Sequence, residues 1–190
     1  MSGDRVAGLF SHELLAKCEQ MPDFPVVTFE NGENLADEVV TYQDLFLNGC
    51  RIAHALRKAG IGAGDRFSLV MRNHPEFIYT MLAASITGAV VVPIDPRSKG
   101  SKLSYQIRDS NSLGIIYTSE FSDDVETSLK ELKGVKVIGV SYKDGFPKPA
   151  GNGRPSINEI LEGPESGLPD GMNLNLNVPF EVIYTSGTTG

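Results

Sequence analysis

The sequence predicts an α/β fold: a mostly parallel sheet covered by helices on both faces. Helical and β-rich segments alternate from residue 41 to residue 140, which is typical of parallel sheets with helical crossovers. The β-rich runs, residues 90–94 above all, are apolar without polar alternation, as in strands buried on both faces. A length of 190 residues fits one domain, or one domain with a short appendage.

The first predicted helix begins at Thr41, which can cap it, and ends just before Gly60. Between them Leu45, Ile52 and Leu56 fall on one face at helical spacing. A short strand over residues 66–71 follows. A second helix begins at Pro75, a residue favoured in the first helical turn, and closes at Gly88, which can adopt the left-handed conformation.

Residues 90–94 are expected to form a central, almost fully buried strand of this sheet. The alternation continues with helices over residues 102–111 and from about Ser122, and with strands over residues 113–118 and 135–140. We expect three regions. An α/β subdomain covers residues 1–142, and a Pro/Gly-rich connector with a short helix at 156–161 covers residues 143–177. Residues 178–190 begin the next subdomain with an apolar strand over 180–184.

Composition excludes some classes of function. The formal charge of −7, from 17 basic and 24 acidic residues, disfavours nucleic-acid binding. No signal or transit peptide is expected at the N-terminus, and the longest apolar stretch, residues 81–94, is too short to span a membrane. Cys18 and Cys50 lack metal-ligand spacing, so we expect reduced thiols, no metal ligands and a cytoplasmic protein; the oligomeric state is open.

The last residues of the chain carry the strongest chemical signal. A strand ending at Tyr184 leads into a loop rich in hydroxyls and glycines. Gly187 and Gly190 allow a backbone curl whose N–H groups can grip a polyphosphate, and the hydroxyls supply further donors. The glycines are three residues apart and no lysine lies between them, unlike the common P-loop. The expected phosphate-binding residues are Thr185, Ser186, Gly187, Thr188, Thr189 and Gly190.

The sequence YTSGTTG resembles the phosphate-binding signature of the adenylate-forming superfamily. That superfamily holds acyl-CoA synthetases, nonribosomal-peptide adenylation domains and firefly-type luciferases. Two further stretches match in order: residues 40–45 (VTYQDL) look like the family's TYxEL block, and residues 86–96 (ITGAVVVPIDP) look like its GAxxVPxxP block. The resemblance therefore extends from about residue 40 to residue 190.

This resemblance implies the N-terminal part of an ATP-dependent, AMP-forming acyl-CoA synthetase that uses Mg²⁺ and coenzyme A. The carboxylic acid is open: a medium- or long-chain fatty acid and a small acid of the crotonobetaine or carnitine kind both fit. One alternative is an adenylation domain or fatty-acyl-AMP ligase that passes its acyl group to a carrier protein. Another is a non-catalytic nucleotide-binding module. The catalytic residues of the family lie beyond residue 190, so we expect a protein two to three times longer and an inactive 190-residue piece.

Three further residues are weaker candidates for ligand contact. Asn73 and His74 follow the strand over residues 66–71, and Arg97 follows the strand over residues 90–94. Open α/β sheets place ligands at the carboxyl ends of their strands. The favoured alternative is that Asn73 or His74 caps the helix that begins at Pro75. His54 is expected to be a packed or half-exposed side chain of the first helix.

Overall fold

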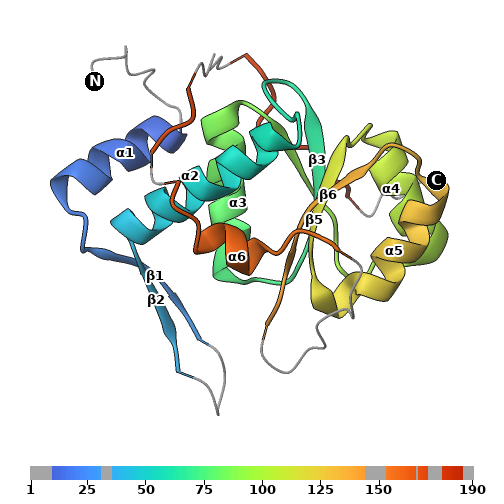
Figure 1. The fold of residues 1–190 in the computed structure, drawn as a ribbon, viewed down its shortest axis with the longest axis horizontal. Helices are drawn as coiled ribbons and strands as arrows, with labels where there is room; N and C mark the ends of the chain where they lie inside the picture. The colour runs from blue at the N-terminus through green and yellow to red at the C-terminus, as the bar shows by residue number, and fades with distance from the viewer. Residues whose placement is uncertain (1–9, 31–35, 144–152, 166, 171–176, 186–190) are drawn as a thin grey trace.

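The computed structural model describes residues 10–30, 36–143, 153–165, 167–170 and 177–185. These residues form a four-stranded parallel sheet with helices on both faces and a separate antiparallel hairpin (Figure 1). The sheet contains β3 (Arg66–Val70), β4 (Val90–Pro93), β5 (Gly114–Thr118) and β6 (Lys136–Ser141), in the order β4-β3-β5-β6. The predicted fold class is confirmed.

Each face of the sheet has its own apolar core. On one face α2 (Tyr42–Lys58), α3 (Pro75–Thr87) and the short α6 (Ile157–Leu161) pack against side chains such as Phe67, Leu69 and Ile116. On the other face α4 (Gly100–Asp109) and α5 (Ser122–Glu131) cover Val70, Ile115 and Tyr117. A turn of 3-10 helix, η1 (Ser119–Phe121), joins β5 to α5. Every named sheet side chain is at most 1% exposed, as expected for strands buried on both faces.

The helix boundaries follow from local sequence signals. Asp44 N donates to Thr41 Oγ1 at 3.1 Å, and Thr41 N donates to Asp44 Oδ2 at 3.0 Å, which forms a capping box at the start of α2. Gly88 ends α3 with a φ of 70°, the left-handed conformation that glycine adopts without strain. The predicted cap and stop residues are confirmed.

The expected central position of residues 90–94 is wrong, although their burial is confirmed. β4 is the terminal strand of the four, because the chain crosses from β4 past β3 to form β5 on the other side. Its three valines are still at most 2% exposed. The free edge of β4 is covered by a late segment, since Val91 N donates to Phe180 O at 3.2 Å and Val182 N donates to Val91 O at 3.0 Å. The strand expected over residues 180–184 is only an isolated parallel bridge between Glu181 and Val91.

A hairpin and a helix precede the sheet. β1 (Pro25–Phe29) pairs antiparallel with β2 (Glu38–Thr41), and α1 (Phe10–Gln20) lies against α2 and α3 (Figure 1). The sequence analysis did not predict this hairpin. Cys18 of α1 and Cys50 of α2 are free thiols, and burial raises the pKa of Cys50 to about 12. None of the described helices is long and apolar enough to cross a membrane.

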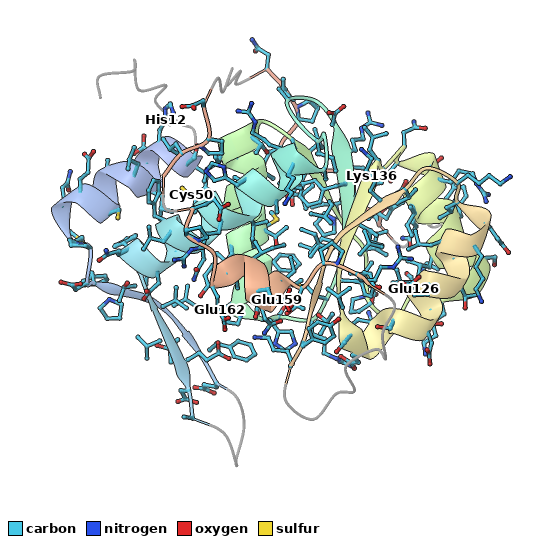
Figure 2. All side chains as sticks on the ribbon, viewed as in Figure 1. His12, Cys50, Glu126, Lys136, Glu159 and Glu162 are labelled. Atoms are coloured by element: carbon cyan, nitrogen blue, oxygen red, sulfur yellow. The ribbon has the colours of Figure 1, made fainter. Side chains whose placement is uncertain are left out.

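The described part of the Pro/Gly-rich segment is held against the sheet by side chains. Glu126 of α5, labelled in Figure 2, accepts from Arg154 at 2.9 and 2.6 Å and from the Tyr117 hydroxyl at 2.7 Å. Three side chains of α2, one turn apart, donate to backbone carbonyls of this segment: Arg51 to Gly163, His54 to Gly167 and Arg57 to Asp170. The helix expected at residues 156–161 is present as α6.

Candidate functional site

The chain leading into the TSGTTG loop runs along the outside of β4. Phe180 and Val182 bond the backbone of Val91, and Val182 and Tyr184 pack against the core beneath α4 and α5. Ile183 points away and is 63% exposed, so the segment alternates like a strand. Thr185 is exposed at the end of this segment. The other predicted loop residues, Ser186, Gly187, Thr188, Thr189 and Gly190, lie outside the described residues.

The hydroxyl of Tyr184 contacts the end of α4. It lies 2.7 Å from Asp109 Oδ2 and 3.2 Å from the carbonyl oxygen of Gln106. Burial raises the pKa of Tyr184 to about 12, and the hydrogen bond to Asp109 adds to the effect. The hydroxyl therefore stays protonated at neutral pH and acts as a donor. Sequence analysis did not anticipate this contact, because Asp109 is 75 residues away along the chain.

A second group of polar side chains lies at the carboxyl edge, the end of the sheet at which its parallel strands finish. Arg72, just past β3, donates hydrogen bonds to the carboxylate of Glu120 in η1. Its Nη2 lies 2.7 Å from Oε1, and its Nε lies 3.0 Å from both carboxylate oxygens. The Arg72 guanidinium also lies 5.8 Å from the centre of the Phe121 ring. Glu120 was missed by sequence analysis. Its place directly after a buried strand was the available signal, but pairing it with Arg72 requires knowing that β3 and β5 are neighbours.

The structure places the candidates Asn73 and His74 at the start of α3. Asn73 is exposed, and His74 is the N-cap residue, yet its side chain makes no capping hydrogen bond. Both ring nitrogens of His74 are shielded from solvent without a hydrogen-bond partner among the described residues. The ring lies 5.3 Å from that of Phe29 in the hairpin. Burial, and then the positive charge of Lys143, lower the pKa of His74. The capping interpretation is therefore right about position and wrong about the bond.

Two further cations of this edge, Lys143 and Arg97, are also paired. Lys143 Nζ lies 2.6 Å from Glu76 Oε1 and 3.9 Å from Glu38 Oε1. The third weak candidate, Arg97, is an exposed side chain that bonds both oxygens of Asp95, at 3.0 and 2.8 Å, and lowers the pKa of that carboxyl to about 2.

These pairings constrain how an anion can bind at this edge. At the described carboxyl edge four cations each face a carboxylate: Arg72, Arg97, Lys99 and Lys143. These four cations are therefore compensated before any anion binds. The residues that the structure describes also contain no group of three or more His, Cys, Asp or Glu placed to hold a metal.

Comparison with known proteins gives the family. A family model described as "AMP-binding enzyme" matches residues 14–190. The chain belongs to this family. The 4-coumarate–CoA ligase CCL1 of Humulus lupulus is 30% identical over 153 residues, which cover 80% of this chain and 27% of that protein. The hybrid PKS-NRPS synthetase pyvA of Aspergillus violaceofuscus is 30% identical over 156 residues, covering 82% of this chain and 4% of that protein.

The fold comparison agrees with the family. A Mycobacterium tuberculosis fatty acyl CoA synthetase superimposes with a TM-score of 0.76 at 23% identity, over 93% of this chain and 32% of that one. At this identity the likeness shows the fold. The chain spans about a quarter of the length of the CoA ligase relative that it matches.

Proposed function

We propose that the protein carrying this chain is an AMP-forming acid–thiol ligase. The observation that supports the proposal most directly is the path of residues 180–185. They run alongside the buried strand β4 and end in an exposed Thr185 at the start of TSGTTG. A loop of this composition can turn several backbone N–H groups and hydroxyls toward one polyphosphate. CoA ligases among the relatives support the reaction class.

The proposed reaction has two steps. A carboxylate oxygen attacks the α-phosphorus of ATP, which forms an acyl-adenylate and releases pyrophosphate. The thiol of coenzyme A then attacks the acyl carbonyl, forms the thioester and releases AMP. Neither step needs a protein nucleophile, so the chain's contribution is positioning and charge stabilisation. Residues from Thr185 to Gly190 would hold the β and γ phosphates.

Mg²⁺ fits this scheme as the ion that arrives with ATP and shares the phosphate charge. Such an ion would neutralise phosphate charge that the four ion-paired cations of the described edge do not.

The acceptor and the acid are less constrained. Coenzyme A is our first choice of acceptor, since relatives include CoA ligases for 4-coumarate and for medium- or long-chain fatty acids. Transfer to a carrier protein is the alternative, supported by the match to a hybrid PKS-NRPS synthetase. A non-catalytic nucleotide-binding module is the remaining alternative. We propose a cytoplasmic location, which the two free thiols support.

Acid-dependent ATP–pyrophosphate exchange by the complete protein tests the proposal. The acids should include short, medium and long aliphatic acids and a hydroxycinnamic acid, each followed by coenzyme A or a phosphopantetheinyl carrier protein. We expect exchange with at least one acid, and a CoA thioester detectable by mass spectrometry. Exchange followed by transfer only to the carrier would favour the carrier-protein alternative. ATP binding without exchange for any acid would support the non-catalytic module and reject the ligase.

A further inference from the structure

We infer that Tyr184 and Asp109 form a positioning pair that sets the direction in which the chain enters the TSGTTG loop. Neither residue touches the reacting atoms in the proposed chemistry. Their role is to fix the segment that presents Thr185. The catalytic consequence rests on the function proposed above, whereas the structural consequence can be tested without it.

The backbone of this segment is fixed only up to Val182. Phe180 and Val182 bond Val91 on the edge of β4, which holds one point of the approaching chain. Ile183 then projects outward and Thr185 is exposed. In the described part of the chain, the last tertiary hydrogen bonds before the loop are those of the Tyr184 hydroxyl. The Tyr184 ring packs against the core, and its hydroxyl adds a directional bond that fixes the orientation of the chain at this point.

Asp109 is placed where its own helix does not favour it. It is the last residue of α4, at the negative end of the helix dipole, where acidic side chains are destabilising. The Tyr184 hydroxyl, 2.7 Å away, supplies a hydrogen-bond donor to that carboxylate. A hydrogen bond to a charged acceptor is stronger than one between neutral groups. The pair therefore gives Asp109 a function that its position in the helix does not explain.

The accepting side of the pair is rigidly connected to the sheet. A chain of hydroxyl donors runs from Ser68 of β3 to Ser112 at 2.8 Å, and Ser112 contacts Ser110 at 2.8 Å, just past the end of α4. Ser110 in turn donates to the carbonyl of Ile107, and Arg66 donates to the carbonyl of Ser110. The end of α4 is thus fixed to β3. Groups that position a binding loop are effective when their own supports are rigid in this way.

The first test measures the pair without any activity. Hydrogen–deuterium exchange of peptides spanning residues 180–185 is compared between the wild type, Tyr184→Phe and Tyr105→Phe in the complete protein. Tyr105 is a matched control, since it is a 56% exposed tyrosine of α4. We expect about 10-fold faster exchange in these peptides for Tyr184→Phe only, as loss of a hydrogen bond to a charged group predicts. Unchanged protection in Tyr184→Phe would overturn the inference.

The second test measures ATP–pyrophosphate exchange in the same variants. Tyr184→Phe should raise the KM for ATP by about 10-fold and leave the KM for the acid unchanged. Asp109→Ala should raise the KM for ATP in the same way, even though it removes a charge that disfavours α4. Asp109→Asn keeps an acceptor oxygen, so its KM for ATP should stay close to the wild-type value.

The double variant separates a pair from two independent residues. Tyr184→Phe combined with Asp109→Ala should raise the KM for ATP no further than either single change. If the two single effects on the KM for ATP multiply in the double variant, the two residues act independently and the pair is contradicted. A KM for ATP that changes only in proportion to thermal stability would contradict it as well. A wild type that shows no exchange would reject the proposed function, and the deuterium experiment would still decide the pair.

Discussion

The ammonium nitrogen of Lys143 lies 2.6 Å from Oε1 of Glu76, and this ion pair joins the chain just past β6 to the first turn of α3. Both side chains are largely buried, with 16% and 7% exposure. We expect Lys143→Ala to reduce the free energy of unfolding by about 3 kcal/mol, because it leaves the buried Glu76 carboxylate without its positively charged partner. Lys143→Met combined with Glu76→Gln should recover most of that loss. Urea denaturation measures both.

A matched control for this prediction is Lys99→Ala. Lys99 pairs with Asp124 at 3.5 Å, but the two side chains are 70% and 32% exposed. Exposed pairs contribute about 0 to 1 kcal/mol, so this variant should unfold at nearly the wild-type urea concentration. Equal losses for Lys99→Ala and Lys143→Ala would show that burial does not set the difference.

His74 should make stability depend on pH. Its pKa is lowered in the folded protein, first by burial and then by Lys143, against opposing contributions from Glu76, Glu120 and Glu38. The unfolded chain therefore takes up a proton near pH 6.5 that the folded chain resists. Stability should be full above that pH and be lost as pH falls toward the lower folded pKa. Unfolding free energies measured from pH 7.5 to 5 should show a shallower fall in His74→Gln. An identical pH dependence in both proteins would contradict this assignment.

Gly49 should not tolerate a methyl group. A Cβ at this position of α2 would overlap the side chain of Leu82 on α3. Alanine favours a helix over glycine by about 1 kcal/mol, whereas overpacking costs about 1 to 3 kcal/mol, so Gly49→Ala should destabilise by up to about 2 kcal/mol. Gly62→Ala, at a site with no atom within 4 Å, is the control and should be nearly neutral. Thermal unfolding of the two variants distinguishes them.

Thr188 and Thr189 should matter for adenylation alone. Replacing either with alanine removes a charge-assisted hydrogen bond to phosphate, which corresponds to about 10- to 150-fold in pyrophosphate exchange. The control is Thr127→Ala, which changes an exposed threonine of α5. Circular dichroism should be unchanged in all three variants. Wild-type exchange in both loop variants would mean that the loop binds something other than the phosphates of ATP.

The 190-residue chain alone should bind ATP weakly. The loop can make only a few hydrogen bonds of about 1 to 3 kcal/mol each, and ordering it costs about 1 to 2 kcal/mol per residue. We expect a dissociation constant no tighter than the millimolar range and no acid-dependent exchange. Calorimetric titration with ATP and Mg²⁺ checks this. Micromolar binding would show that these residues already contain most of the nucleotide site.

Sequence could predict the elements whose signals are local. The cap at Thr41, the stop at Gly88 and the apolar run of β4 each depend on neighbouring residues, and each is present in the structure. The hairpin of β1 and β2 was missed although Asn31-Gly32, a frequent hairpin dipeptide, stands between the two β-rich runs in the sequence.

Strand order and long-range polar pairs could not be predicted in this way. Placing β4 at the edge requires knowing that β5 forms on the far side of β3, which no local pattern encodes. The same is true of Arg72 with Glu120 and of Tyr184 with Asp109, whose partners are 48 and 75 residues apart. The residue types at the candidate site were visible in the sequence, but their neutralising partners were not.

The contacts made by Arg51, His54 and Arg57 recognise carbonyl oxygens of the connector, and every amino acid has the same carbonyl oxygen. The path of residues 163–165 and 167–170 along α2 is thus specified through carbonyl groups, whereas Arg154, Ile157 and Asn158 hold the preceding residues of the connector through their own side chains. Substitutions at Gly167 or Asp170 that preserve the backbone should therefore be better tolerated than changes to the three side chains of α2. Residues 167–170, which are held this way, are a natural place for sequence variation and for the insertion of a short tag, because their route depends little on their composition.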